Sequence, residues 1–167
     1  KVGQLVKIDL GVLYEGYHTD SATTVLVGFN PNDKTHLHKM ELMDVCREAL
    51  QIGIEHAVVG NTTGDLGNAI EKYVKSKGFE VVKDLVGHGI GKSIHESPEV
   101  ANYGKKKEGD PLRPGMVIAI EPMVVTGADT TEPGEDGFAY KTIDGGLAVH
   151  FEHTVAITPS GPQVLTL

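Results

Sequence analysis

The first 28 residues alternate between apolar and polar positions in a pattern that predicts a β-hairpin. The sequence Glu15-Gly16 separates two β-prone runs and predicts a two-residue turn, with Tyr14 opposite Tyr17. Apolar side chains occupy every second position of the first run, which is the period of a strand with one apolar face: Val6, Ile8, Leu10 and Val12. We therefore expect two antiparallel strands within residues 5–28.

Two aspartates lie in this hairpin, on the face opposite the apolar row. The register that the turn imposes places Asp20 opposite Gly11, and Asp9 opposite Ala22. The two carboxylates then become diagonal neighbours, roughly 7–8 Å apart at Cβ. Like charges so placed repel unless a cation lies between them, and two divalent ions about 3.5–4 Å apart would fit that gap. A solvated face with two unrelated acids is the alternative that the hairpin alone leaves open.

Two helices are predicted after the hairpin. Residues 30–33, Asn-Pro-Asn-Asp, form a helix start signal, and apolar residues follow at three- and four-residue spacing as far as Ala57. Thr63 predicts the start of a second helix that runs through Lys77 and ends at Gly78. Three histidines on or near the first helix are expected to lie at the surface: His36, His38 and His56.

The second half of the chain predicts short strands between glycine-rich loops. Strands are expected over residues 79–86, 116–120, 138–143 and 147–158. The turn Asp144-Gly145-Gly146 would join the last two as a hairpin, and residues 127–137 have loop composition. We therefore predict one α+β domain over residues 1–167, with helices packed on one side of a mostly antiparallel sheet.

Composition narrows the classes of function. The 167-residue chain carries a net charge of -8, which argues against a nucleic-acid surface. The single cysteine, Cys46, excludes an internal disulfide and suits a reducing compartment. No apolar run reaches the ~18 residues of a membrane span and no signal peptide is visible, so we expect a soluble, cytoplasmic protein. Because the chain opens at Lys1 and enters a strand almost at once, we also expect that an N-terminal part precedes it.

Two motifs of other enzyme classes are incomplete in this chain. Residues 91–93, Gly-Lys-Ser, end like a P-loop, but Val86 stands where the first glycine is required. The sequence His95-Glu96 begins like a helical zinc motif, but Glu99 replaces the second histidine and Pro98 would disrupt the helix. Neither a nucleotide-binding loop nor that type of zinc protease is predicted.

Five side chains remain as candidates for metal chemistry: Asp9, Asp20, His88, Glu121 and Glu152. Four carboxylates with one imidazole suit manganese, iron, cobalt or zinc pairs better than a closed thiolate site. Each residue alone has an ordinary structural explanation, such as a loop histidine or an acid on a solvated strand face. Together they argue for a shared site, because Glu121 and Glu152 interrupt apolar strands, where an unpaired charge is costly.

The candidates lie within motifs that follow one another along practically the whole chain. Asp9 and Asp20 come first, and the others are Gly87-His88-Gly89-Ile90-Gly91 with His95, Ile120-Glu121-Pro122-Met123, and Phe151-Glu152-His153-Thr154. In this combination the chain resembles methionine aminopeptidases of the pita-bread metallopeptidase family. Met123 and His153 favour the methionine branch, because prolidases and Xaa-Pro aminopeptidases typically have glycine and aspartate there. The short interval between Glu121 and Glu152 resembles type I enzymes.

The resemblance implies a pita-bread fold, in which helices cover the outer face of a curved antiparallel sheet. It also implies two divalent metal ions, which could be cobalt, manganese, iron or zinc. Asp20 and Glu152 would bridge the two ions. Asp9 would hold one of them, and His88 and Glu121 would complete the other.

The implied activity is removal of the N-terminal methionine from proteins and peptides, by attack of a metal-activated hydroxide on the first peptide bond. Glu121 would shuttle the proton, and His95 would hydrogen-bond the scissile carbonyl. The metal on Asp9 would anchor the substrate's amino group, and Ile94 and Phe138 match part of the methionine pocket. The implied partners are N-terminal segments of proteins, with the ribosome as a further candidate, and neither DNA nor a membrane; the chain is expected to be a monomer.

Two alternatives stay open. The chain could instead be an Xaa-Pro aminopeptidase or prolidase-like peptidase, or a pita-bread domain that binds protein or RNA without catalysis. The family has a further histidine and several pocket walls N-terminal to its first aspartate, in a region that this sequence does not contain. We therefore expect this chain to bind metal, and full activity and methionine selectivity to depend on that region.

Overall fold

The N-terminal hairpin forms as the alternation predicts. The computed structural model describes residues 1–167, and its first two strands are β1 (Leu5–Tyr14) and β2 (Tyr17–Leu26). They pair antiparallel in the predicted register. Glu15 and Gly16 have positive φ angles of 48° and 83°, which is the backbone of a two-residue hairpin turn that matches the twist of its strands. The predicted turn and register are therefore confirmed.

Both predicted helices are present, as α1 (Lys34–His56) and α2 (Thr63–Ser76). The second helix is capped by Thr62 and not by Thr63. The Thr62 side chain accepts a hydrogen bond from the backbone of Asp65, whose carboxylate accepts one from the backbone of Thr62, so this reciprocal pair sets where the helix begins. Neither helix combines the length and the hydropathy needed to cross a membrane.

His36 departs from its expected surface position. Its side chain is buried, and its Nδ1 accepts a hydrogen bond of 3.0 Å from the backbone N–H of Asn30. The Nε2 atom lies so close to Gly3 that a Cβ there would be 2.7 Å from it. His36 therefore connects the start of α1 to the segment before β1 and to the loop after β2, whereas His38 is exposed as expected.

The remaining strands are short, and all the strand pairs are antiparallel. They are β3 (Glu80–Val81), β4 (Gly87–Gly89), β5 (Glu96–Val100), β6 (Val117–Ile120), β7 (Met123–Val125), β8 (Thr131–Pro133), β9 (Tyr140–Thr142), β10 (Ala148–His150), β11 (Glu152–Thr158) and β12 (Gly161–Val164). Seven of the twelve strands form the main sheet in the order β1-β2-β11-β6-β4-β5, with β12 also paired to β11. Strands β10, β7 and β3 form a second sheet, and β8 pairs with β9.

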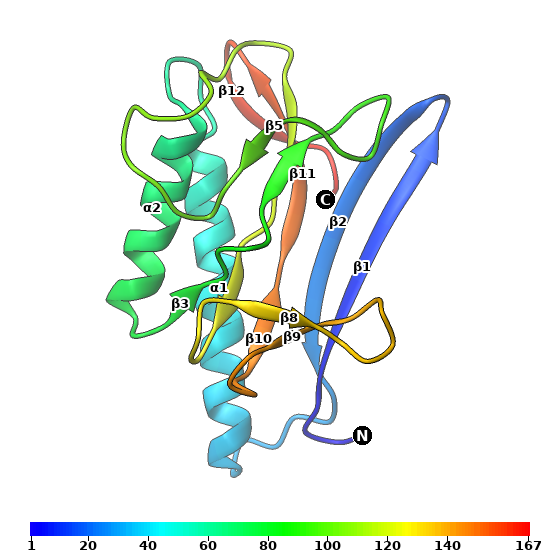
Figure 1. The fold of residues 1–167 in the computed structure, drawn as a ribbon, viewed down its shortest axis with the longest axis vertical. Coiled ribbons are helices and arrows are strands. Elements are labelled where there is room, and N and C mark those ends of the chain that lie inside the picture. Colours follow the sequence, from blue (N-terminus) through cyan, green and yellow to red (C-terminus); the bar gives the residue numbers. More distant parts are fainter.

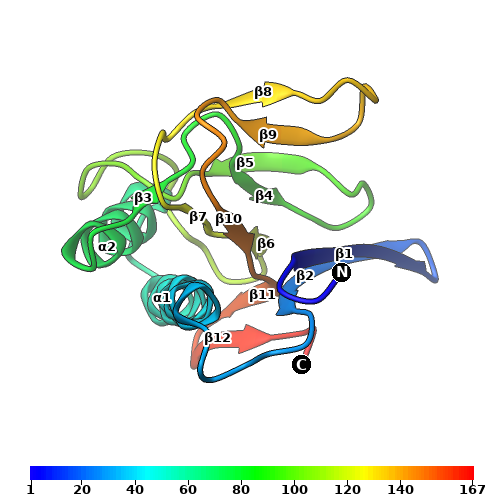
Figure 2. The ribbon, with the colours of Figure 1, turned by 90° about the horizontal axis from the view of Figure 1, so that it is seen from below.

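The helices lie on one side of the main sheet (Figure 1). Seen from below, β1–β2 and β4–β5 extend to the same side, away from α1 and α2, with β6 and β11 between them (Figure 2). One cluster of 22 buried apolar residues joins the helices to the sheet. The predicted α+β class, with helices on one side of an antiparallel sheet, is confirmed.

Two strand predictions in the second half are wrong. Residues 79–86 form a strand only at β3, because Lys83 and Asp84 contact a neighbouring loop. Lys83 Nζ lies 2.7 Å from an Asp129 carboxylate oxygen, and the Asp84 carboxylate accepts a hydrogen bond of 2.8 Å from the Thr131 N–H. Residues 138–143 form only the short β9, which pairs with β8 and not with the following strand. The segment 127–137 is therefore not entirely loop, since it contains β8.

The Asp144 turn explains why the predicted last hairpin does not form. The Asp144 carboxylate accepts hydrogen bonds of 2.7 and 2.9 Å from the backbone N–H groups of Ala128 and Gly146. These bonds connect the turn to the preceding loop. The chain after the turn therefore pairs with β7 and not with β9. The predicted strand 147–158 is divided in two, with β10 paired to β7, and β11 paired to β2, β6 and β12.

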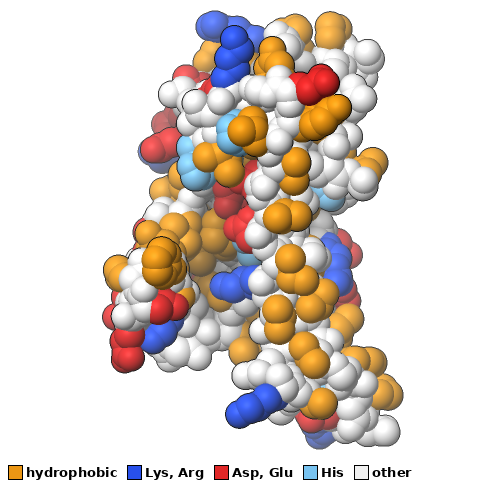
Figure 3. Space-filling view, turned by 90° about the vertical axis from the view of Figure 1, so that its right-hand side faces the viewer, with side chains coloured by type: hydrophobic (Ala, Val, Ile, Leu, Met, Phe, Trp, Pro, Cys, Tyr) orange, Lys and Arg blue, Asp and Glu red, His pale blue; other side chains and the backbone are white.

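The outer face of β1 is exposed. The apolar row that revealed the strand keeps much of its surface accessible: Val6 41%, Ile8 51%, Leu10 63% and Val12 47%. Hydrophobic side chains run along this strand in the space-filling view, beside a hollow that contains acidic and histidine side chains (Figure 3). The alternation therefore marks the strand correctly, although this row is not part of the core.

Candidate metal centre

Three of the predicted acids meet on adjacent strands of the main sheet. Asp9 lies opposite Ala22, and Ala22 lies opposite Glu152, so that these positions form one row across β1, β2 and β11. Asp20 is two residues before Ala22 and its side chain is on the same face. Each of the three acids offers an oxygen, and these oxygens lie within 4.8 Å of one another.

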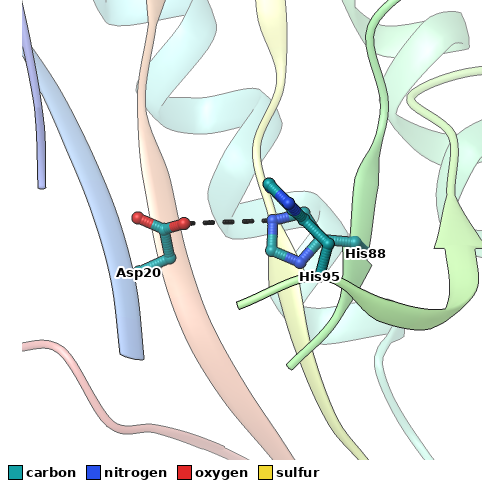
Figure 4. A group of neighbouring side chains, drawn as sticks. All are labelled: Asp20, His88 and His95. Atoms are coloured by element: carbon teal, nitrogen blue, oxygen red, sulfur yellow. Dashed lines mark ion pairs between the residues drawn. The ribbon is translucent and has the colours of Figure 1, made fainter. Parts of the chain in front are cut away.

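His88 and Glu121 approach the same place from the other side of the cleft. His88 Nε2 lies 3.5 Å from Glu121 Oε1 and 4.0 Å from Asp20 Oδ2. Figure 4 shows Asp20 on β2 facing the imidazole of His88. His88, Glu121 and Glu152 form a second group of potential ligand atoms within 4.8 Å of one another. The structure thus brings all five predicted residues together.

The glycines that flank His88 let β4 lie between two other strands. A Cβ on Gly87 would be 2.4 Å from the carbonyl oxygen of Ala119 on β6, and one on Gly89 would be 2.2 Å from the carbonyl oxygen of Ser97 on β5. No side chain fits at either position. His88 is therefore held in a buried strand, where its Nδ1 pairs with the Gly89 carbonyl oxygen at 2.9 Å and its Nε2 faces the acids.

His95 lies in the loop between β4 and β5, next to His88. The two rings are 4.4 Å apart at their centroids and meet edge to face. A ring nitrogen of His95 lies within 4.8 Å of ligand atoms of Asp20 and His88 (Figure 4). His95 is exposed to the cleft, so its imidazole is accessible to a ligand that enters there.

His150 joins the cluster although the sequence did not single it out. Its Nε2 is buried without a hydrogen-bond partner, 3.4 Å from Glu121 Oε2 and 4.0 Å from Glu152 Oε2. The available signal was its spacing, since His150 is two residues before Glu152 and so shares a face of the predicted strand 147–158 with it, although the structure places the two residues on β10 and β11. In an otherwise apolar strand that alternation indicates a common polar site.

The cluster opens into a cleft of about 960 Å³. Asp9, His88, His95, Glu121 and His150 line it together with Lys7, Met123 and Tyr140. Its acidic and histidine groups are visible in the hollow beside β1 (Figure 3). The dimensions suit the end of a peptide better than a single small ion.

The two residues predicted for a methionine pocket lie apart from the lining of this cleft. Ile94 packs against the hairpin, where a Cβ on Gly11 would be 2.7 Å from its Cδ1. Phe138 is 90% exposed and does not line the cleft, whereas Tyr140 on β9 does. The roles of Ile94 and Phe138 in a methionine pocket stay predictions.

The charges of the cluster are suited to bound cations. Burial, together with the nearby charges of Glu121, Asp20 and Asp9, raises the pKa of Glu152 to about 9. Lys7 lines the cleft but is not paired with any of these acids, and burial lowers the pKa of its ammonium group. The cluster thus combines crowded carboxylate oxygens with the imidazole nitrogen of His150, which has no hydrogen-bond partner, and no cationic side chain is paired with the acids. Divalent metal ions suit such a set of donors.

Because the pKa of Glu152 is raised on folding, the metal-free protein should become less stable as the pH rises. Below pH 4.5 the Glu152 carboxyl is protonated in both the folded and the unfolded protein. Between pH 4.5 and about 9 the folded protein keeps this proton and the unfolded chain releases it, so rising pH favours unfolding. We expect a loss on the order of a few kcal/mol across this range. Thermal unfolding in a chelator at pH 5.5 and 8.5 measures it.

Glu152→Gln is the matched variant for this test, because it removes the titrating group and keeps its shape. The difference in stability between the two pH values should become smaller in the variant than in the unmodified protein. An unchanged difference would show that other groups are responsible.

Comparison with known proteins agrees with this chemistry. Residues 1–159 match the profile of Metallopeptidase family M24. A methionine aminopeptidase from Clostridium perfringens is 46% identical over 167 residues, which are 100% of this chain and 65% of the relative. The crystal structure of a methionine aminopeptidase from Thermotoga maritima superimposes with a TM-score of 0.93 at 42% identity, over 99% of this chain and 65% of that one. The crystal structure of a prolidase from Pyrococcus horikoshii superimposes with a TM-score of 0.75 at 31% identity, over 99% of this chain and 40% of the prolidase.

The comparisons confirm the resemblance to methionine aminopeptidases and the predicted pita-bread fold. This chain spans about 65% of the length of the relatives that it matches. The methionine aminopeptidases are more similar to it than the prolidase, both in identity and in structure. The match covers the hairpin, both helices and every residue of the acidic cluster, and on this basis the chain belongs to metallopeptidase family M24.

Proposed function

We propose that this chain is the catalytic domain of a metal-dependent aminopeptidase that removes N-terminal methionine from peptides and proteins. The observation that supports it most strongly is the cluster of Asp9, Asp20, His88, Glu121 and Glu152 at the base of an open cleft. The proposal that methionine is the residue removed rests on relatives named methionine aminopeptidase, which are 46% identical to this chain or less.

The cluster would hold two divalent ions, since its donors are four carboxylates and one imidazole. Asp20 and Glu152 would be ligands of both ions, Asp9 of one, and His88 with Glu121 of the other. The alignment of Asp9 and Glu152 across the sheet supports this division, as does the contact between His88 and Glu121. When bound, such ions supply positive charge that polarises a peptide carbonyl and favours ionisation of water at neutral pH.

The protein's own groups would bind the substrate and move its protons. Glu121 carries a carboxylate that can take a proton from water and return it to the leaving amine. His95 is exposed beside His88 and can donate a hydrogen bond to the carbonyl of the bond to be cleaved. The acidic cleft attracts the positively charged N-terminus of a peptide, which favours cleavage at a chain end.

The proposed setting follows from this substrate. N-terminal methionine is found on newly made proteins, so we place the enzyme in the cytoplasm, as a monomer that acts on nascent chains near the ribosome. The buried free thiol of Cys46 is compatible with a reducing compartment. Cobalt, manganese, iron and zinc all suit the donor set.

Assay of two peptides tests the proposal. The chain loaded with manganese should release methionine from Met-Ala-Ser and leave an Xaa-Pro peptide intact, and a chelator should abolish the release. Because the chain spans only about 65% of its relatives, we expect a rate below that of a full-length relative. Cleavage of the Xaa-Pro peptide alone would identify a prolidase-like enzyme, and binding of metal without any cleavage would favour a non-catalytic module.

A further inference from the structure

Strand β2 and strand β11 are joined by very few backbone hydrogen bonds at the acidic cluster. Their ladder pairs only Ala22 with Glu152 and Ser21 with His153. Asp20 continues β2 beyond that ladder, and its N–H and C=O groups point away from β1, because alternate residues of a hairpin turn their backbone groups outward. Something other than a strand backbone must therefore satisfy the Asp20 backbone.

The hydroxyl of Thr154 supplies both missing bonds. Thr154 Oγ1 accepts a hydrogen bond of 2.8 Å from the Asp20 N–H and donates one of 2.7 Å to the Asp20 carbonyl oxygen. Thr154 has no exposed surface. One side-chain oxygen thus replaces a pair of ladder bonds at the point where the two strands separate.

Thr24 does the same at the other end of this short ladder. Its Oγ1 accepts a hydrogen bond of 2.9 Å from the His150 N–H and donates one of 2.8 Å to the His150 carbonyl oxygen. Thr24 is also fully buried. The two hydroxyls therefore enclose the stretch in which Asp20 and Glu152 face each other.

We infer that Thr154 and Thr24 are positioning residues of the metal centre, which set the separation of Asp20 and Glu152 by fastening β2 to β10 and β11. This inference rests on the proposed function, because it concerns the two acids assigned as shared ligands. Each hydroxyl accepts one hydrogen bond from, and donates one to, the backbone of a single residue, which fixes the distance between the strands. Without these bonds the two strands could shift relative to each other. Groups that orient metal ligands typically contribute about 10- to 100-fold to metal affinity.

Isosteric variants separate the hydroxyl from the shape of the side chain. Thr154→Val keeps the branched side chain and loses both hydrogen bonds, whereas Thr154→Ser keeps the hydroxyl. Thr63→Val is the control, because Thr63 Oγ1 is a buried acceptor for Asp110 N–H at 3.1 Å, in a region outside the cleft. Titration of each metal-free protein with manganese, and its thermal unfolding, are the readouts.

We expect manganese to bind Thr154→Val at least 10-fold more weakly than the unmodified chain, Thr154→Ser within about threefold of it, and Thr63→Val unchanged. Unchanged affinity of Thr154→Val, with only its unfolding temperature lowered, would overturn the inference and leave the proposed function standing. Equally weak binding by Thr154→Ser would also overturn it. If Thr154→Val does not fold, Thr24→Val decides, since unmodified affinity in that variant contradicts the inference. An unmodified chain that binds no manganese would overturn the proposed function first.

Discussion

Replacing Glu121 with alanine or glutamine should abolish turnover of Met-Ala-Ser while the fold remains intact. Glu121 lies 3.5 Å from His88 and 3.4 Å from His150, in the centre of the acidic cluster. The proposal gives it two tasks, holding a metal ion and moving the proton. Loss of proton transfer alone typically costs about 100- to 10,000-fold, so we expect a fall of about 1,000-fold or more in kcat.

The fold should survive this change, because Glu121 is one of the acids that repel Glu152. Removing that charge relieves a like-charge contact in the metal-free protein, and the unfolding temperature should stay the same or rise. Glu132→Gln, at an exposed glutamate on β8, is the matched control and should keep full activity. Normal turnover by Glu121→Gln would contradict the assigned role.

The hairpin shows why part of the fold could be predicted from sequence. Its turn is specified locally by Glu15-Gly16, and the turn then sets the pairing of every residue up to Leu26. The places of Asp9 and Asp20 in the hairpin could therefore be predicted from the turn alone. Both helices were predictable for the same reason, since their start signals and apolar spacing are local.

Strands β4 and β5 could not be predicted from the same kind of pattern. Glycine and proline are poor strand formers, yet β4 contains Gly87 and Gly89, and β5 contains Pro98. The reason for the glycines lies in the neighbouring strands, whose carbonyl oxygens leave no room for a Cβ. Such contacts are long-range, and the glycines around β4 do not by themselves identify the strands that make them.

The pairing of the last strands was mispredicted for a similar reason. Asp144-Gly145-Gly146 has the composition of a hairpin turn, but the Asp144 carboxylate is used to bind the loop at Ala128. His150 was not chosen as a candidate, although it alternates with Glu152 along the sequence, and its distance of 3.4 Å from Glu121 shows that it belongs to the cluster. The motif chemistry pointed to five residues, and the fold added a sixth neighbour.

Neutralising Asp20 should remove metal binding almost completely. Asp20 is a buried residue of β2. Its carboxylate lies near those of Asp9 and Glu152 and near the imidazole of His88. As a proposed shared ligand it contacts both ions, so Asp20→Asn should weaken binding by more than the ~10- to 100-fold typical of groups that only orient ligands. Asp110→Asn, at an exposed loop aspartate outside the cleft, is the control and should bind as the unmodified chain does.

Calorimetric titration of the metal-free chain with manganese tests the central proposal most directly. We predict binding of two ions per chain at micromolar concentration, with release of a proton at pH 7, because the Glu152 carboxyl, whose pKa is about 9, must ionise to act as a ligand. A chain that binds no manganese at micromolar concentration, or binds it equally well after Asp20→Asn, would contradict the assignment of this cluster as a dinuclear metal site.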